Sequence, residues 1–512
     1  MIFLGYDYGT TNSMVSRYTG EGQDGVKILD RRPSSVQIRS PKRLFSDTPI
    51  DEVRACGYLH DFTRDVFQHL NPLFLAQDKV FVTATVPNAF KDVQCKLMID
   101  TVRNTLKDVF SETQFMDGAV SIIPEPVAAA LYYVCQQSVL DRNGPGLVSV
   151  CDIGGGTTDL AIVRYLVSGE EGAKSIQFKV ICTEGCDRLG GDDIDEIIAN
   201  YLRERFDLDK YHYSQEMLLK DCQALKRQLS RKDSASVVLT ASDRQNPELN
   251  SNGDVIELSM TRRMFNELMK RNLQSRFISL FTSLKQSFAD TIGEDMNTAE
   301  RILTERSTIL PVGGSSQIPY LQEIMSEQLK GTIYYLPGET ANDMGHAPFD
   351  SVVRGAAIYA AWQQRCLNGI RDIVIEDRTL HRISIKVNGN QLETIVEKNM
   401  PSEIYSPHRQ LFPLRADAGG DTFRISRIDI YEGEGAFVGD SSYGTPPVHL
   451  RSLADVLENL DDQIFVHGRD LQEIDIDINL SIVQGRLHTL NVSIPQGNED
   501  KTDYIKQIEF LT

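Results

Sequence analysis

Residues 148–162 read Val148-Ser-Val-Cys-Asp152-Ile-Gly154-Gly155-Gly156-Thr157-Thr158-Asp159-Leu160-Ala161-Ile162. An apolar run enters a tight turn and a second apolar run leaves it, which predicts a β-hairpin. Three consecutive glycines let backbone N–H groups approach an anion, because no Cβ stands in the way. Asp152 can hold a divalent cation through water, and the threonine hydroxyls can contact phosphate. The turn therefore predicts a phosphate site. A glycine-rich turn without a ligand is the alternative.

The N-terminal segment repeats this pattern. Apolar residues 2–6 lead into Asp7-Tyr-Gly9-Thr10-Thr11-Asn12-Ser13, and a second apolar run follows. Both copies have a strand, an aspartate, one further residue, a glycine, a threonine pair and a return strand. Two such turns predict two halves of similar topology that face one phosphate group.

Three further features accompany the two turns. Glu125 stands between two prolines where a short strand meets an Ala-rich helix, and Pro126 suits the first helical position. A carboxylate that is merely stabilised by the helix dipole is the alternative for Glu125. Gly190-Gly191 and Gly313-Gly314 each precede an expected helix, which suits the approach of phosphate or ribose.

Composition excludes several classes of protein. The 512 residues hold 53 Lys and Arg against 72 Asp and Glu, a formal charge of −19. This charge argues against general binding to nucleic acid or anionic membranes, since both require basic surface. The eight cysteines lack paired zinc spacing, so we expect reduced thiols in a cytoplasmic protein. The N-terminus has no basic region before an apolar run, so neither a signal peptide nor a membrane span is expected.

The spacing of apolar residues along the chain changes near residue 370. Strand and helix patterns alternate before it, and period-two apolar patterns dominate after it. Asn388-Gly389 and Gln484-Gly485 are typical hairpin turns. We therefore expect an α/β domain over residues 1–368 and a mainly antiparallel β-domain over 381–512. Residues 369–380 are the expected linker, which is apolar enough to dock in at least one state.

The motifs resemble those of the DnaK-type chaperones, the seventy-kilodalton heat-shock proteins, over almost the whole chain. The resemblance implies an α/β actin-like ATPase fold, with two lobes and a duplicated ribonuclease-H-like core, followed by an antiparallel β-sandwich that binds peptides. The matching segments are the phosphate loops 7–13 and 152–159, the connecting segment 123–130, the nucleoside-contacting segments 189–193, 222–230 and 312–319, and the β-domain strands 428–434 and 474–494. We expect no counterpart of the family's helical lid after the β-domain.

The resemblance also implies a site for ATP or ADP with Mg²⁺ in a cleft between the lobes. The implied metal ligands are Asp7 and Asp152, which also count among the catalytic residues with Glu125, Thr157 and Asp159. The implied phosphate contacts are Gly9, Thr10, Thr11, Asn12, Gly154, Gly155, Gly156 and Thr157. The implied contacts around the nucleoside are Gly190, Gly191, Gln223, Lys226, Arg227, Ser230, Gly313, Gly314, Ser315, Gln317 and Asp350.

The chain departs from the family at the catalytic lysine. In one alignment Lys42 takes this place. In a second alignment, gap-free from Pro33, Lys42 replaces a glutamate and the true lysine is deleted. We favour the second alignment, and a surface Lys42-Arg43 pair is the plainest interpretation of this segment. Losing a cation that neutralises transition-state charge costs a few kcal/mol, or roughly a hundredfold in rate.

Two substitutions affect the nucleoside contacts. Gln223 replaces a glutamate that contacts ribose in the family, and it retains the ability to form hydrogen bonds without the charge. Gln317 replaces an arginine that stacks on adenine, so a planar cation is lost there. These departures weaken the expectation of hydrolysis more than that of binding.

Three functions stay open at this point. The first is a chaperone that binds ATP, hydrolyses it slowly and couples this to peptide binding. Its expected partners are extended hydrophobic segments of unfolded clients, with J-domain or nucleotide-exchange co-chaperones. Without a lid, peptide exchange should be fast. The second is a non-hydrolysing nucleotide-binding scaffold that acts through a partner. The third is a small-molecule kinase of the same superfamily, against which the β-domain argues.

Overall fold

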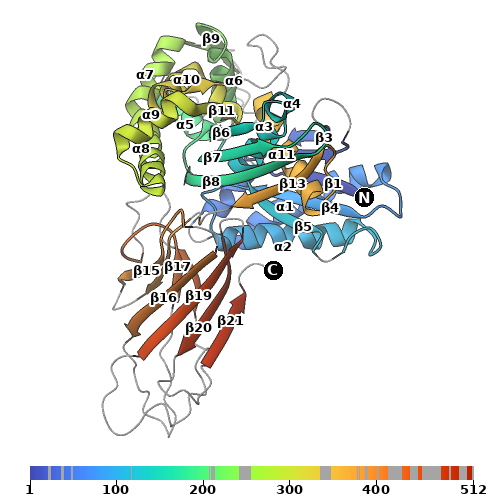
Figure 1. Ribbon diagram of the computed structural model, residues 1–512. Helices are drawn as coiled ribbons and strands as arrows, with labels where there is room; N and C mark the ends of the chain where they lie inside the picture. Colours follow the sequence, from blue (N-terminus) through green and yellow to red (C-terminus); the bar gives the residue numbers. More distant parts are fainter. Residues whose placement is uncertain are drawn as a thin grey trace, which may run out of the picture.

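The computed structural model describes most of the first 400 residues and the strands that follow. The described residues are 1–20, 25–35, 40–47, 50–116, 118–206, 208, 214–240, 255–334, 347–376, 379, 381–386, 390–400, 403–412, 429–438, 448–452, 474–483, 486–494 and 504–509. The chain forms two lobes that each contain a mixed sheet, with further strands beyond them (Figure 1). No helix in this described part is long and apolar enough to cross a membrane.

The first sheet has five strands in the order β3-β2-β1-β4-β5. β1, β2 and β3 form an antiparallel meander, while β4 and β5 run parallel to β1. The strands are β1 Ile2–Asp7, β2 Asn12–Tyr18, β3 Val26–Pro33, β4 Val80–Val86 and β5 Val120–Pro124. The turn at Asp7 thus joins the first two strands of a sheet.

The second sheet has six strands in the order β12-β11-β6-β7-β8-β13. β6, β7 and β8 form an antiparallel meander, and β11 and β12 run parallel to β6. The strands are β6 Gly144–Ile153, β7 Thr158–Ser168, β8 Lys174–Cys186, β11 Ser307–Val312, β12 Thr332–Ile333 and β13 Ile370–Glu376. Apart from β13, its order and directions repeat those of the first sheet. The two halves of similar topology, predicted from the paired turns, are therefore present.

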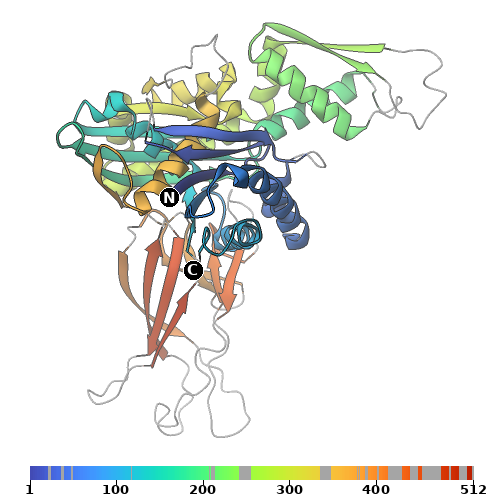
Figure 2. The same cartoon turned by 90° about the vertical axis from the view of Figure 1, so that its right-hand side faces the viewer.

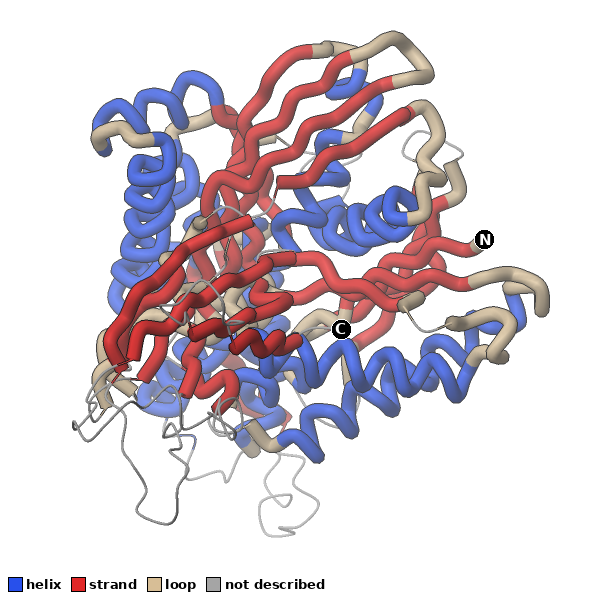
Figure 3. The backbone as a smooth tube through the Cα atoms, turned by 60° about the horizontal axis from the view of Figure 1, so that its bottom comes forward, coloured by secondary structure: helices blue, strands red, loops and turns tan. Residues whose placement is uncertain are grey.

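Helices pack along the faces of both sheets (Figure 3). Those of the first lobe are α1 Glu52–Leu70 and α2 Asp92–Val109, with the 3-10 helices η1 Pro41–Ser46 and η2 Asn71–Leu73. Those that begin between the lobes or in the second are α3 Glu125–Val134, α4 Gln137–Leu140, α5 Gly191–Phe206, α6 Gln215–Leu229, α7 Arg262–Asn272, α8 Gln274–Ile292, α9 Met296–Arg306, η5 Gly314–Gln317, α10 Pro319–Leu329 and α11 Ala347–Gln363.

Helix α1 illustrates how local sequence sets these elements. The Asp51 side chain accepts a hydrogen bond from the Arg54 N–H and so caps the first turn. Apolar residues at helical spacing, among them Leu59 and Phe67, are buried against the first sheet. The helix ends at Leu70, because Pro72 lacks the N–H that would continue the ladder.

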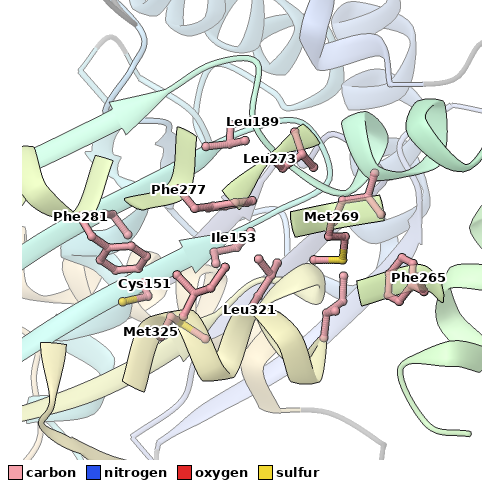
Figure 4. Packing of buried hydrophobic residues seen from close by; sticks show 14 of the residues in the cluster. Cys151, Ile153, Leu189, Phe265, Met269, Leu273, Phe277, Phe281, Leu321 and Met325 are labelled. Carbon is pink, nitrogen blue, oxygen red and sulfur yellow. The ribbon is translucent and has the colours of Figure 1, made fainter. Parts of the chain in front are cut away.

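The outer face of the second sheet holds the largest core cluster. Cys151 and Ile153 of β6 pack against Phe277 of α8 and Leu321 of α10, and all four side chains are buried (Figure 4). The hairpin of β9 Ser234–Thr240 and β10 Val255–Thr261 projects from this lobe (Figure 2). The turn at Asp152 therefore rests on a rigid, fully packed strand.

Helices α3 and α11 pack against each other between the two sheets. A Cβ placed on Gly355 of α11 would overlap the carbonyl oxygen of Ala128 in α3. A Cβ placed on Gly5 of β1 would lie 2.6 Å from the backbone nitrogen of Ala357. Both contacts are backbone against backbone, so only glycine fits. This close packing fixes the first sheet relative to α3, and thereby relative to Glu125.

The expected linker is part of the second sheet. Residues 370–376 form β13, which pairs in parallel with β8. The Trp362 indole N–H donates a hydrogen bond of 3.0 Å to the carbonyl oxygen of Ile373. Ile373 is buried, which explains the apolar composition of this segment.

The described strands beyond residue 381 all pair antiparallel, in two four-stranded sheets with the orders β15-β14-β17-β18 and β16-β19-β20-β21. The strands are β14 Ile383–Lys386, β15 Leu392–Val396, β16 Glu403–Phe412, β17 Asp429–Glu432, β18 Val448–Ser452, β19 Ile474–Val483, β20 Arg486–Ile494 and β21 Tyr504–Glu509. The predicted turns Asn388-Gly389 and Gln484-Gly485 lie outside the described residues.

Candidate functional site

The two Asp–Gly–Thr turns meet at the bottom of a cleft between the lobes. In the second turn, Asp152 of β6 lies opposite Asp159 of β7 in the register of the hairpin. A Cβ on Gly155 would overlap the Thr11 hydroxyl of the first turn, and one on Gly156 would lie 2.9 Å from the Thr10 methyl group. The glycines therefore allow the two turns to approach each other and leave backbone N–H groups accessible.

A cavity of about 390 Å³ opens beside these turns. Most of the residues predicted from sequence line it, and they come from both lobes. They are Asp7, Gly9, Thr10, Thr11, Asn12, Glu125, Asp152, Gly154, Gly155, Thr157, Gln223, Lys226, Arg227, Ser230, Gly313, Gly314, Ser315 and Gln317. The volume falls within the range of small-molecule sites.

The remaining predicted residues lie behind this lining. Gly190 packs against the backbone of Gly155, and the Gly191 N–H donates to the Gly154 carbonyl oxygen at 3.0 Å. Asp159 is fully buried. Asp350 does not line the cavity and forms an ion pair of 3.0 Å with Arg354, one turn later on α11. Gly190, Gly191 and Asp350 therefore shape the walls of the cavity rather than its surface, whereas the Asp159 carboxylate hydrogen-bonds Thr157 of the lining.

Lys42 is not a surface residue, and that expectation is wrong. Its side chain is 3% exposed, lines the cavity and forms an ion pair with Glu125. Helix η1 brings it there, because the side-chain amide of Gln94 donates to the Phe45 carbonyl oxygen at 2.8 Å and Arg43 pairs with Asp193 at 2.5 Å. A buried lysine therefore faces the two turns, even though the alignment that we favoured assigns its position to a glutamate.

Burial dominates the electrostatics of the cavity floor. It raises the pKa of Asp7 to about 6 and that of Asp159 to about 7, and it raises the pKa of Asp152 as well. Burial by itself would lower the pKa of Lys42. The negative charges of Glu125 and Asp7 have a larger combined effect, so the pKa of Lys42 is raised above its usual value. The lysine therefore stays charged among carboxylates that are costly to ionise without a further cation.

Three of these carboxylates are held by neighbouring groups. Glu125 begins α3, so its carboxylate lies at the positive end of the helix dipole. The Asp7 carboxylate accepts a hydrogen bond of 2.8 Å from the Thr85 hydroxyl. The Asp159 carboxylate accepts one of 3.2 Å from the Ala89 N–H. The acidic groups are therefore preorganised rather than mobile.

One wall of the cavity is formed by helix α6. The Lys226 ammonium donates to the Gly191 carbonyl oxygen at 2.6 Å and pairs with Asp195 at 2.9 Å, so it ties α6 to the glycine turns. The Ser315 hydroxyl donates to the Gly154 carbonyl oxygen at 2.8 Å. Gln223 and Gln317 contribute uncharged amides to this part of the lining.

Sequence reasoning missed several lining residues, among them Arg31 and Arg231. Arg231 follows Arg227 by four positions, so helical spacing from Gln223 could have indicated it. Arg31 gives no such signal, because its place depends on the register that pairs it with Met14 of β2.

The donor set fits a nucleoside triphosphate with Mg²⁺. Glycine turns, threonine hydroxyls and a buried lysine are typical ligands of phosphate. Asp7 and Asp152 supply carboxylates for a cation that keeps several waters and also binds phosphate oxygens. In the described part of the chain no cluster of three or more His, Cys, Asp or Glu could hold a metal by itself. A Mg²⁺ ion that is bound by Asp7, Asp152, water and phosphate oxygens together does not require such a cluster.

Comparison with known families agrees with the geometry. The family model described as "Hsp70 protein" matches residues 83–442, which is 360 of the 512 residues (442 − 83 + 1). The match includes the second phosphate turn, Glu125 and the segment that forms β13.

Proposed function

Because the chain belongs to the Hsp70 family, we propose that it binds ATP with Mg²⁺ in the cleft, hydrolyses it slowly and couples the nucleotide state to peptide binding by the strands beyond β13. Membership supports a chaperone-type, ATP-binding protein with an actin-like fold.

In this proposal, backbone N–H groups of the two turns and the hydroxyls of Thr10, Thr11 and Thr157 bind the phosphates. Bound Mg²⁺ would neutralise phosphate charge and lower the cost of ionising Asp7 and Asp152. The main contribution of the protein is positioning and charge stabilisation, as is general for phosphoryl transfer.

Glu125, in the lining, and Asp159, which reaches the cavity through its hydrogen bond with the lining residue Thr157, have the task of orienting and deprotonating the attacking water. Asp159 suits a general base, because burial raises its pKa to about 7, close to neutral pH. Lys42 holds Glu125 through their ion pair and brings a positive charge to the cavity where negative charge develops.

Buried Lys42 is the observation that favours hydrolysis over the scaffold alternative. The alternative of a non-hydrolysing scaffold was based on the expected loss of this lysine, together with the neutral side chains of Gln223 and Gln317. With Lys42 in the lining, the cavity has hydroxyls, paired carboxylates and a lysine in one place. Gln223 and Gln317 would affect only the contacts to the nucleoside. They do not replace any of the hydroxyls, the carboxylates or the lysine proposed for hydrolysis.

Single-turnover hydrolysis of labelled ATP tests the proposal. We expect measurable turnover in the wild type, and a fall of about a hundredfold in Asp159→Ala, because a general base contributes 10²–10⁴ in rate. Arg263→Ala, an exposed position on α7 outside the cavity, is the control and should match the wild type. A wild-type rate no greater than that of buffer would support the scaffold instead.

The proposed coupling rests on contacts between the lobes and the segment around β15. Lys398 pairs with Glu184 of β8 at 2.7 Å, and both side chains are largely buried. The Thr183 N–H donates to the Asn399 side chain at 3.2 Å, and His381 hydrogen-bonds the Phe90 carbonyl oxygen at 3.1 Å. Phe90 follows Ala89, whose N–H holds Asp159. A change at Asp159 can therefore reach the β-domain through a short stretch of backbone.

Lys398→Ala should loosen this docking. Loss of a charged hydrogen bond costs about 1.5 kcal/mol, which corresponds to roughly tenfold faster local opening. Hydrogen exchange measured by mass spectrometry should show faster exchange in β13 and β15. Lys386→Ala removes a lysine of β14 that has no ion pair within the described residues, and it should leave exchange unchanged. Unchanged exchange in Lys398→Ala would argue against docking through Glu184.

The partners that we propose follow from the family and the strands. We propose that the two antiparallel sheets form a β-sandwich that binds extended hydrophobic segments of unfolded clients. Co-chaperones of the J-domain or nucleotide-exchange type would act on the lobes.

A further inference from the structure

A second pocket, of about 420 Å³, lies on the second lobe where helices α5 and α7 meet. Its lining consists of Tyr201 from α5 and of Arg263, Met264, Glu267, Leu268 and Arg271 from α7. None of these residues lines the cavity beside the phosphate turns. Helix α7 lies at the end of the molecule opposite strands β15 to β21 (Figures 1 and 2). The pocket is therefore separate from the proposed ATP site, and those strands leave it uncovered.

Part of the pocket is apolar. Met264 and Leu268 lie one turn apart on α7, so they share a face, and both side chains are half-buried. The Tyr201 ring adds apolar surface from α5. Arg205 holds this ring, because its guanidinium donates to the Tyr201 hydroxyl at 2.8 Å and lies 5.9 Å from the ring centroid. An apolar side chain of a ligand can therefore exchange water for contact here.

Two arginines flank the apolar pair along α7. Arg263 precedes Met264 and Arg271 follows Leu268, so the arginines are separated by roughly 12 Å along the helix axis. Both are exposed, and neither forms an ion pair with a described residue. Glu267 is the acidic residue of the lining, and it has no ion pair with either arginine. The lining thus carries a net positive charge, although the chain as a whole has a formal charge of −19.

This arrangement favours an acidic protein segment over other anions. A guanidinium binds a carboxylate through two parallel hydrogen bonds. In an extended segment, acidic residues four positions apart and an apolar residue midway between them share one face, with the acids roughly 13 Å apart. That spacing matches the two arginines with the apolar pair between them. A nucleic acid is attracted by many cations and gains nothing from apolar contact, and Glu267 would repel its phosphates.

We propose that the pocket between α5 and α7 binds an extended acidic segment of a partner protein. Two carboxylates of the segment pair with Arg263 and Arg271, and an apolar side chain between them packs on Met264 and Leu268. Glu267 limits the affinity, because its charge opposes the bound carboxylates. The site goes beyond the proposed function, since it requires neither ATP nor the strands beyond β13.

Titration of a labelled peptide into the full chain without nucleotide tests the proposal. The probe is a capped glutamate–serine–leucine–serine–glutamate peptide, followed by fluorescence anisotropy at low salt, where charge contacts are least screened. We expect saturable binding to the wild type. Affinity should fall by about tenfold in Arg263→Ala and in Arg271→Ala, because each loses a charge-assisted contact. Glu267→Gln should bind about threefold more tightly, because a repelling charge is removed.

Lys270→Ala is the matched control. It removes a positive charge from an exposed position of α7 outside the lining, so it should bind the peptide like the wild type. A peptide with glutamines in place of both glutamates should not bind, and one with serine in place of leucine should bind more weakly. Thermal unfolding of every variant should match the wild type, since only exposed side chains are changed.

Three results would overturn the proposal. The first is a wild type that does not bind the peptide, and the second is wild-type affinity in both arginine variants. The third is equal binding of an oligothymidylate, which would show a general site for polyanions. Failure of the chain to bind ATP would leave these tests intact, because no nucleotide is present. The two sites share no lining residue, so the expectation that Arg263→Ala hydrolyses ATP like the wild type is unchanged.

Discussion

Lys42→Ala should lower the single-turnover rate of ATP hydrolysis by about a hundredfold or more. The Lys42 ammonium lies in the cavity floor with Asp7 and pairs with Glu125. In this buried setting a positive charge acts more strongly than it would in water. Its removal leaves the charge that develops on the transferred phosphate uncompensated, and it frees Glu125 to move from its position.

The effect on binding should be smaller than the effect on rate. The two turns still supply N–H groups and hydroxyls, so ATP affinity should fall by about tenfold at most. Lys42→Arg keeps the charge and should retain part of the activity. Breaking a buried ion pair also destabilises a protein, by about 3–5 kcal/mol, so circular dichroism must show that each variant is folded. A folded Lys42→Ala variant with wild-type turnover would remove Lys42 from the mechanism.

The second large effect is on stability. Gly355→Ala should lower the free energy of unfolding by about 3 kcal/mol, because the new methyl group would overlap the Ala128 carbonyl oxygen. The backbones of α3 and α11 must then separate, and α3 carries Glu125 at its first position. Weaker ATP hydrolysis should accompany the loss of stability.

Gly57→Ala is the matched control for this substitution. Gly57 is exposed within α1, and a Cβ there would meet no atom within 4 Å. Alanine should therefore raise stability by about 1 kcal/mol through helix propensity. Trp362 is the only tryptophan of the chain and lies on α11, so its fluorescence during urea unfolding reports both variants. Equal stability of the two variants would contradict the close packing of α3 and α11.

The features that sequence predicted well depend on local pattern. The β6–β7 hairpin around Asp152, the related turn at Asp7 and the placement of Glu125 at a helix start all follow from neighbouring residues. Their meeting in one cavity followed from the duplicated pattern, which two sheets of the same strand order bear out.

The features that sequence missed depend on contacts between distant segments. Lys42 reaches the cavity because η1 is held by Gln94 and Asp193, which lie 52 and 151 positions away in the chain (94 − 42 and 193 − 42). Arg31 lines the cavity because of its strand register with Met14. The expected linker forms strand β13, because its backbone pairs with β8 of the second sheet. Patterns within a single segment contain no information about such partners.

Equilibrium dialysis of the folded chain against labelled ATP tests the central claim most directly. The account predicts one ATP retained per chain in the presence of Mg²⁺ and much weaker retention when EDTA removes the metal, because Asp7 and Asp152 then face the phosphates without a cation. A chain that is folded by circular dichroism and retains no ATP with Mg²⁺ would contradict it.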